Sequence, residues 1–424
     1  LVGSEMCIRD RPQMTKSVQL LSPVSGNDHC TIGMRLLFRR RKVHPYVRTM
    51  WDFANADFDA YRNALCHTDW DECFAEDDVD AATEKWTENV MSIAKANIPH
   101  KDVTVRPSDK PWYSNELRLL CRRKDRIHKK AKQLQTQEAW TQFRAVRNEY
   151  FNQVSEAKQE YENHKYQYLI NENNSTKKWW SVVKSIQKEN DAFEAIPPLE
   201  VGGHILTDDK DKASSFNEFF LEASTVDDDG HNVPDEPGVI DGGLNSIDIT
   251  LKDVTDQIAC LDKSKSYGPD SISPVFLKEG GEVLAESICK LYNMSLRLCK
   301  VPKTWKQANV VPIHKKNAQN LRNNYRPVSL LSVLGKILER VIFKYVFNYF
   351  REHYILSIFQ SGFMPGMSTV TQLLEVYHSF CKAVDEGKEI RVVFLDITKA
   401  FDRVWHKGLI YKLPRCGIRG SLLE

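Results

Sequence analysis

Hydrophobic and polar positions along this chain follow mainly the period of amphipathic helices. Apolar residues recur at helical spacing in five long stretches, and each predicts a helix: 79–98, 114–169, 283–298, 330–349 and 369–384. Ser114 stands at the N-cap position of the second stretch, with Glu116 in its first turn. The pattern therefore predicts a chain that is mostly helical.

Two apolar runs predict strands instead. Residues 305–313 contain one, and Val392 to Leu395 form the other. The second run is apolar at successive positions, which fits a strand buried on both faces of a sheet. Helices combined with a sheet near the end of the chain predict the α+β class.

Residues 196–250 break regular structure. They contain paired prolines, paired glycines and the acidic run Asp227–Asp229, and they predict a flexible connector. A short amphipathic helix, 211–221, is predicted within this connector.

Composition excludes several classes of protein. Hydrophobic residues make up 42% and charged residues 27% of the 424 residues, with a net charge of +2, as in ordinary soluble proteins. No apolar run approaches the roughly 20 residues of a membrane span, so no membrane partner is expected. The ten cysteines are scattered without a Cys-x-x-Cys pair, which predicts reduced thiols in an intracellular protein.

Positive charge gathers in the first half of the stretch 114–169. The cations there are Arg118, Arg122, Arg123, Lys124, Arg126, Lys129, Lys130 and Lys132, opposed only by Glu116 and Asp125. A basic helical face with interleaved aromatic residues suits a nucleic-acid phosphate backbone. A solvated helix face between domains explains the same pattern equally well.

Asp396 carries the strongest chemical signal. It follows the apolar run directly, and a carboxylate at the end of a buried strand is costly unless a metal ion or another partner compensates it. A helix-like start follows, whose amides from Ile397 to Phe401 can face a triphosphate. The ring of Phe401 can block a 2′-hydroxyl and favour deoxynucleotides. Asp402 fits either a second acid of the site or a carboxylate at a helix N-terminus.

Basic residues after the first strand suggest a phosphate clamp. Lys315 and Lys316 end that strand, and Arg326 stands just before a proline in the next segment. Lysine supplies a point charge and arginine a planar fork for phosphate oxygens. Further on, Gln360 to Thr369 is a glycine-rich loop in which Ser368 or Thr369 caps the next helix.

Phe394 to Val404 resembles the first catalytic motif of reverse transcriptases of non-LTR retrotransposons, the LINE type, and of jockey-like elements in particular. Upstream blocks agree in order and spacing over roughly 250–424: 267–270, 301–305, 312–316, 324–327, 334–339 and 360–363. The resemblance implies a right-hand polymerase, with fingers and a partial palm in 251–424. It also implies copying of RNA into DNA by two-metal nucleotidyl transfer.

The resemblance implies roles for individual residues. Asp396 would be the catalytic aspartate, and Asp396 and Ile397 would hold Mg²⁺ or Mn²⁺. Lys315, Lys316, Arg326, Ile397 and Phe401 would bind the deoxynucleoside triphosphate. An RNA template and a DNA primer or target are the expected partners, with nuclear and cytoplasmic localisation.

The rest of the chain fits the same family. Asn27-Asp28-His29 is similar to the closing Ser-Asp-His motif of its endonuclease, with Asp28 and His29 as a remnant. The resulting division is 1–13 non-native, 14–43 an endonuclease-type domain tail, 44–195 a basic helical linker, 196–250 a connector and 251–424 the polymerase part. Residues 1–13 resemble translated sequencing-adapter sequence.

The family's Ala-Asp-Asp motif is not matched by any segment of the sequence. We therefore expect this chain alone to be inactive, and its last third to leave apolar surface uncovered. The alternative is a non-catalytic nucleic-acid-binding remnant or a domesticated protein that uses the basic helix.

Overall fold

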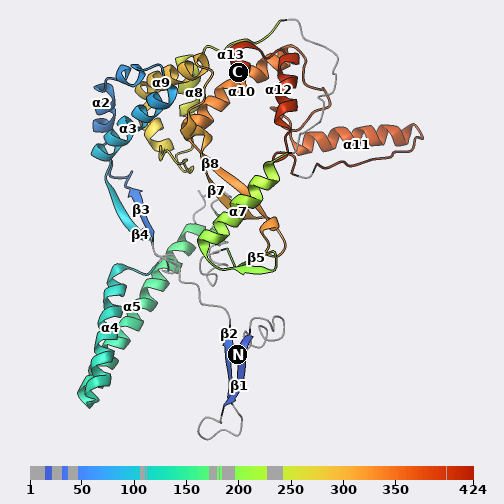
Figure 1. Ribbon diagram of the computed structural model, residues 1–424. Helices are drawn as coiled ribbons and strands as arrows, with labels where there is room; N and C mark the ends of the chain where they lie inside the picture. Colours follow the sequence, from blue (N-terminus) through green and yellow to red (C-terminus); the bar gives the residue numbers. More distant parts are fainter. Residues whose placement is uncertain are drawn as a thin grey trace. The chain divides into compact units, whose positions relative to one another are not determined.

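The computed structural model, drawn in Figure 1, describes residues 15–21, 31–36, 46–105, 110, 112–170, 179–180, 182–183, 196–226, 242–397 and 399–424. The chain forms two compact units: 1–49 with 102–195, and 50–101 with 196–424. The mixture of helices and strands predicted from the sequence is confirmed.

The first unit contains a hairpin of strands and a pair of long helices. Its elements are β1 (Thr15–Leu21) antiparallel to β2 (Thr31–Leu36), α4 (Asn115–Leu134) and α5 (Gln137–Ile170). Ser114 caps α4 by accepting a hydrogen bond from the Leu117 amide, as predicted. The single helix predicted over 114–169 is wrong, because Gln135 takes a left-handed conformation and ends α4. Helix α5 then runs back along α4.

Strand β3 (Tyr46–Trp51) pairs with β4 (His100–Val105). The helices of the second unit gather around one core, as Figure 1 shows. They are α2 (Phe58–Cys66), η2 (Asp71–Phe74), α3 (Val79–Asn97), α8 (Leu251–Ala259), α9 (Pro274–Arg297) and α10 (Val333–Glu352).

Aromatic and aliphatic side chains fill this core without exposed surface: Tyr61, Trp86, Phe276, Leu284, Leu291 and Tyr292. Their polar groups are satisfied. The Trp86 indole N–H donates to Ser287 Oγ at 2.8 Å, and the Tyr292 hydroxyl donates to the Leu334 carbonyl at 2.7 Å. A buried polar group without such a partner would cost about 1–3 kcal/mol.

Residues 50–101 therefore pack with helices of the range 251–424, whereas the sequence grouped them with the basic helices. Trp86 and Val90 on α3 meet the apolar face of α9. Exposed ion pairs accompany the same contact, among them Lys290–Asp71 at 2.6 Å and Lys300–Asp78 at 3.0 Å. Such pairs add little individually, so the buried apolar contact supplies most of the attachment.

A second, smaller cluster involves part of the predicted connector. Its elements are β5 (Leu199–Val201), β6 (His204–Leu206), α7 (Asp209–Ser224), β7 (Ala308–His314), η4 (Arg322–Asn324) and β8 (Tyr325–Leu331). Leu199 and Phe216 pack with Tyr325. The helix predicted over 211–221 is confirmed and longer, while the acidic run 227–229 lies outside the described residues.

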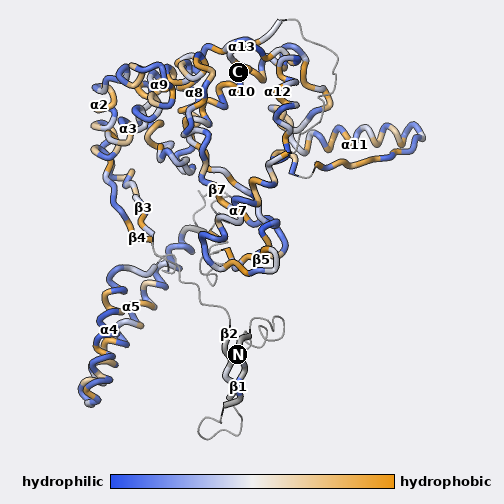
Figure 2. Tube along the Cα trace, viewed as in Figure 1, coloured by the Kyte–Doolittle hydropathy of each residue, from blue (hydrophilic) through white to orange (hydrophobic). Residues whose placement is uncertain are grey.

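The remaining elements are η3 (Lys303–Lys306), α11 (Thr369–Asp385), α12 (His406–Arg415) and α13 (Gly420–Leu423). Ser368 caps α11 in a capping box with Thr371, which confirms the predicted cap. None of the residues of α11 is buried. In Figure 2 hydrophobic and hydrophilic residues alternate along this helix.

The predicted buried strand at 392–395 is wrong. These residues form neither strand nor helix, and Phe394 and Leu395 are 92% and 90% exposed. A strand obtains its hydrogen bonds from a neighbouring strand. Among the described residues no strand pairs with this segment, since β7 and β8 form a two-stranded sheet by themselves. The expectation of uncovered apolar surface in the last third is thus borne out.

Within the part of the chain that the structure describes, no helix is both long and apolar enough to cross a membrane.

Candidate functional site

The predicted phosphate clamp lies on the β7–β8 ribbon. Ile313 is paired with Arg326, and the Lys315 amide extends the ladder by donating to the Asn324 carbonyl at 2.8 Å. Paired residues point to the same face of a sheet, and every second residue shares that face. Lys315 and Arg326 are thus placed on one face as diagonal neighbours, and both are exposed. Lys316 is also exposed, one residue beyond.

The second part of the predicted site is the segment from Asp396 to Phe401. Asp396 and Ile397 are exposed, on backbone without regular structure. The predicted helix start after Asp396 is wrong: α12 begins only at His406, and the Lys399 carbonyl accepts from the amides of Asp402 and Arg403 at 2.9 and 3.0 Å. A turn therefore replaces the helix N-terminus that would have aimed several amides at a triphosphate, and Asp402 lies outside α12.

Phe401 meets the loop that precedes α11. Its ring lies 5.8 Å from the ring of Phe363 in an edge-to-face arrangement, and the two side chains are 79% and 83% exposed. The structure thus joins two motifs that the sequence separated by about forty residues. Phe363 has a φ of 63°, an uncommon conformation for a bulky residue.

A contact that the sequence did not indicate lies next to this turn. The Lys399 ammonium stands 4.5 Å from the ring centroid of Phe219 on α7, and the Arg322 guanidinium stands 5.3 Å from the same centroid. Arg322 also donates to the carbonyl and hydroxyl of Ser215, at 3.3 and 3.2 Å. No periodicity could have revealed this, because the three elements are far apart in the chain.

The two parts of the predicted site are not joined. In the described part of the chain, no hydrogen bond or ion pair links Lys315, Lys316 or Arg326 to Asp396 or Phe401. Lys315, Lys316 and Arg326 on the ribbon and the Asp396 turn are thus separate features of the described structure.

The donor set at Asp396 does not make a metal site. Within the described ranges, no group of three or more histidine, cysteine, aspartate or glutamate side chains is placed to hold an ion. A divalent cation in a polymerase site needs several oxygen ligands. One exposed carboxylate and the Ile397 carbonyl do not suffice. Asp28 and His29 lie outside the described residues.

The Tyr267–Asp270 block has a structural role in this fold. Gly268 packs against backbone: a Cβ there would stand 2.5 Å from the Ser332 nitrogen. The Asp270 carboxylate accepts a 2.5 Å hydrogen bond from Ser332, the N-cap of α10. Burial raises the pKa of Asp270, and the Ser332 hydrogen bond offsets part of that rise. The block thus fastens its turn to the start of α10.

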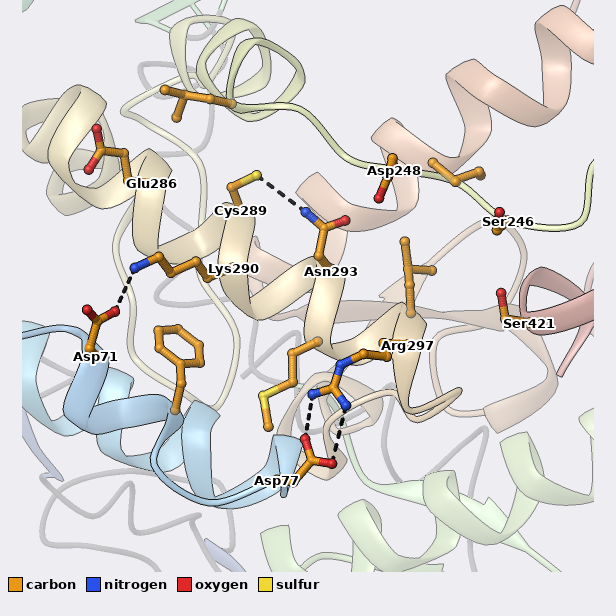
Figure 3. A pocket seen from close by; sticks show the side chains of 15 residues that line it. Asp71, Asp77, Ser246, Asp248, Glu286, Cys289, Lys290, Asn293, Arg297 and Ser421 are labelled. Atoms are coloured by element: carbon orange, nitrogen blue, oxygen red, sulfur yellow. Dashed lines mark hydrogen bonds and ion pairs between the residues drawn. The ribbon is translucent and has the colours of Figure 1, made fainter.

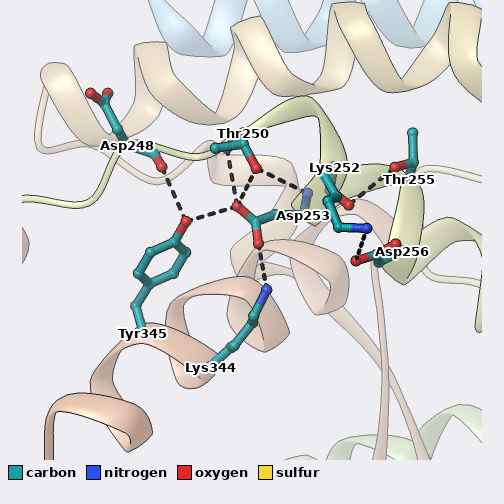
Figure 4. Close-up of polar contacts among 8 residues, drawn as sticks. All are labelled: Asp248, Thr250, Lys252, Asp253, Thr255, Asp256, Lys344 and Tyr345. Carbon is teal, nitrogen blue, oxygen red and sulfur yellow. Dashed lines mark hydrogen bonds and ion pairs between the residues drawn. The ribbon is translucent and has the colours of Figure 1, made fainter.

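A second buried carboxylate ties α8 to α10, as Figure 4 shows. Asp253 accepts from Lys344 Nζ at 2.7 Å, from the Tyr345 hydroxyl at 2.8 Å and from the Thr250 hydroxyl at 2.6 Å. Burial by itself would raise the pKa of Asp253, but these hydrogen bonds outweigh it and hold the pKa well below its usual range. Sequence reasoning missed this residue, whose only local signal is the Thr250–Asp253 capping box.

A cavity of about 890 Å³ lies beside α9 (Figure 3). Apolar side chains such as Phe74 and Met294 line it together with charged ones. Lys290 and Arg297 at its rim are engaged by Asp71 and Asp77. None of the residues predicted to act in catalysis lines this cavity.

Part of the chain is similar to known proteins. Residues 313–423 match the family model described as reverse transcriptase (RNA-dependent DNA polymerase). This matched range contains Lys315, Lys316, Arg326, Asp396 and Phe401.

Three relatives come from Drosophila melanogaster. The "Probable RNA-directed DNA polymerase from transposon BS" is 30% identical over 258 residues, 58% of this chain and 28% of that protein. The RNA-directed DNA polymerase from mobile element jockey is 36% identical over 170 residues, 39% of this chain and 18% of that protein. The "Probable RNA-directed DNA polymerase from transposon X-element" is 33% identical over 179 residues, 41% of this chain and 20% of that protein. The chain spans less than a third of the length of these relatives.

Proposed function

We propose that this chain, whose resemblance to reverse transcriptases of LINE-type, jockey-like retrotransposons is confirmed, carries the fingers and part of the palm of an RNA-directed DNA polymerase. The match over 313–423 supports the proposal most, because it contains the blocks 324–327, 334–339 and 360–363 together with the Asp396 motif. The substrates would be an RNA template, a DNA primer and deoxynucleoside triphosphates.

Each candidate residue has a proposed role in that polymerase. Lys315 and Arg326, neighbours on one face of the β7–β8 ribbon, would bind triphosphate oxygens, with Lys316 beside them. Asp396 would be the catalytic aspartate, and Phe401 would exclude a 2′-hydroxyl. The family generally uses divalent metal ions such as Mg²⁺. Asp396 and Ile397 would supply two of the ligands, and further carboxylates must come from outside the described residues.

Activity requires 391–397 to pair with another strand. In the structure this segment is exposed and unpaired within the described ranges. A carboxylate on an unpaired segment is not held with the accuracy that catalysis requires. We therefore propose that the chain by itself does not extend a primer.

Primer extension tests both statements. With an RNA template, a DNA primer and Mg²⁺, the purified chain is expected to give no product, and robust extension would contradict the proposed inactivity. In a complete polymerase that contains this sequence, Asp396→Ala is expected to abolish extension. The matched control Asp385→Ala changes an exposed acid at the end of α11 and should leave extension unchanged.

A second candidate function is nucleic-acid binding by α4. Arg122, Arg123, Arg126, Lys129 and Lys130 are all exposed on α4, and Arg126 lies three or four residues from each of the other four. None of the five forms an ion pair within the described part of the chain. Like charges at this spacing repel one another, and a polyanion would relieve the repulsion.

Filter binding of the whole chain to single-stranded RNA tests this function. Each phosphate contact contributes about 0.7 to the slope of log affinity against log salt concentration. The pair Arg126→Gln and Lys129→Gln should lower the slope by about 1.4. The control pair Lys252→Gln and Lys265→Gln removes equal charge from other exposed helix and turn positions. Equal effects of the two pairs would rule out a specific role for α4.

A further inference from the structure

The turn after Asp396 is held from a distant helix. Lys399, three residues beyond Asp396, places its ammonium 4.5 Å from the ring centroid of Phe219 on α7. This separation lies within the roughly 6 Å over which a cation is attracted to an aromatic face. The contact joins residues 180 positions apart in the sequence (399 minus 219).

Phe219 is itself fixed by a second cation. Arg322 of η4 lies 5.3 Å from the same ring centroid and donates two hydrogen bonds to Ser215, one turn earlier on α7. Ser215 is 6% exposed, and these hydrogen bonds are partly shielded from water. The ring is half-buried, between a fixed guanidinium and a lysine on the turn.

The backbone at Lys399 needs such support. Its φ of 55° is left-handed, which costs a non-glycine residue roughly 1–2 kcal/mol. A conformation of this kind persists only where surrounding contacts determine it. The two amides that donate to the Lys399 carbonyl close the turn locally, and the Phe219 ring holds its side chain.

The neighbouring motif residues have few other contacts. Residues 391–397 pair with no strand in the described part of the chain. Beyond the turn, Phe401 contacts the exposed ring of Phe363. Among the described residues, the contact at Phe219 links the turn of the Asp396 motif to a helix with buried residues.

We propose that Phe219 is a positioning residue for Asp396: Arg322, Phe219 and Lys399 form a cation–π clamp that fixes the turn of the catalytic motif to α7. The part of this proposal that concerns catalysis rests on the proposed polymerase function. The clamp itself does not, because it concerns the fold of this chain.

Hydrogen exchange of the intact chain tests the cation–π clamp without measuring catalytic activity. The amides of Asp402 and Arg403 donate to the Lys399 carbonyl, and their exchange reports opening of the turn. Phe219→Leu keeps an apolar helix-forming side chain but removes the aromatic face. We expect exchange at 402 and 403 to become about 2- to 5-fold faster. The control Phe220→Leu removes the adjacent ring, which contacts no cation among the described residues, and should leave this exchange unchanged.

The reciprocal variant is Lys399→Met, which keeps the side-chain length and removes the charge. It should accelerate exchange to the same degree, and the double variant with Phe219→Leu should be no faster than either single one. Additive effects, or no effect of either substitution, would overturn the clamp. Phe219→Tyr keeps an aromatic face and should retain slow exchange; if Phe219→Leu unfolds α7, slow exchange in the tyrosine variant supports the clamp and fast exchange overturns it.

Primer extension by a complete polymerase then tests the link to catalysis. Phe219→Leu should lower kcat with little change in the KM for triphosphate, while Phe220→Leu leaves both unchanged. An equal loss in the two leucine variants would contradict positioning. If no form extends a primer, the proposed function fails, and the exchange results still decide whether the clamp exists.

Discussion

Two parts of the second unit differ sharply in how their apolar residues are used. Around α3, α9 and α10, side chains such as Trp86, Leu284 and Tyr292 are fully buried. Between 354 and 410, side chains of the same kind are exposed, including Phe394 at 92% and Leu395 at 90%. The segment with the strongest functional motif is thus the one with the least tertiary support. Apolar sequence alone does not bury a residue; a partner surface is also required.

The largest expected difference in stability is between two leucine-to-alanine substitutions, one in the buried core and one in the exposed segment. Leu284→Ala should lower the free energy of unfolding by about 2–5 kcal/mol, since it removes buried atoms and leaves a cavity. Leu395→Ala should change it by less than about 0.5 kcal/mol. Urea unfolding of both variants measures the difference. A cost above about 1 kcal/mol for Leu395→Ala would show that 391–397 is paired in solution.

The next largest effect concerns Asp253, the buried carboxylate that joins α8 to α10. Asp253→Asn should cost about 1.5–3 kcal/mol at neutral pH, because it removes charge-assisted hydrogen bonds from Lys344, Thr250 and Tyr345. The folded pKa of Asp253 lies below its ordinary value of 3.8. The stability it contributes is therefore complete above that value and is lost as pH falls toward the folded pKa.

Urea midpoints of the two proteins should consequently converge as the pH is lowered below about 4. Asp385→Asn on α11 serves as the control in the less supported part, and its free energy of unfolding should stay within about 0.5 kcal/mol of the parent's. If the urea midpoint of Asp253→Asn differed from that of the parent by the same amount at every pH, Asp253 would stabilise the fold through its packing and not through its charge.

The smallest effect compares two glycines. Gly268→Ala places a Cβ 2.5 Å from the Ser332 nitrogen and 2.6 Å from the Leu331 carbonyl carbon. Backbone atoms cannot move aside as a flexible side chain does, so we expect the free energy of unfolding to fall by about 1–3 kcal/mol. Gly362→Ala meets no atom within 4 Å and should stay within about 0.5 kcal/mol. Equal thermal stabilities of the two variants would contradict the close approach of Gly268 to α10.

Much of the helical structure could be predicted from the sequence. Residues 79–98 and 369–384 were assigned to within a residue or two, and Ser114 and Ser368 cap their helices as expected. Helix hydrogen bonds join residues four apart, so the local pattern contains most of the information. The polymerase-like motifs could also be predicted, because residue type and order carry them.

Tertiary structure decided the rest. The sequence could not show that α3 packs with α9 rather than with the basic helices, or that Asp253 joins α8 to α10. It also assigned 392–395 to a buried strand that the structure does not form. Strand pairing, core contacts and the Phe219–Lys399 contact join residues far apart in the chain, and their free energy depends on partners that no local pattern contains. The sequence by itself determined the helices and the candidate chemistry, and only the tertiary structure decided which of those residues are held in place.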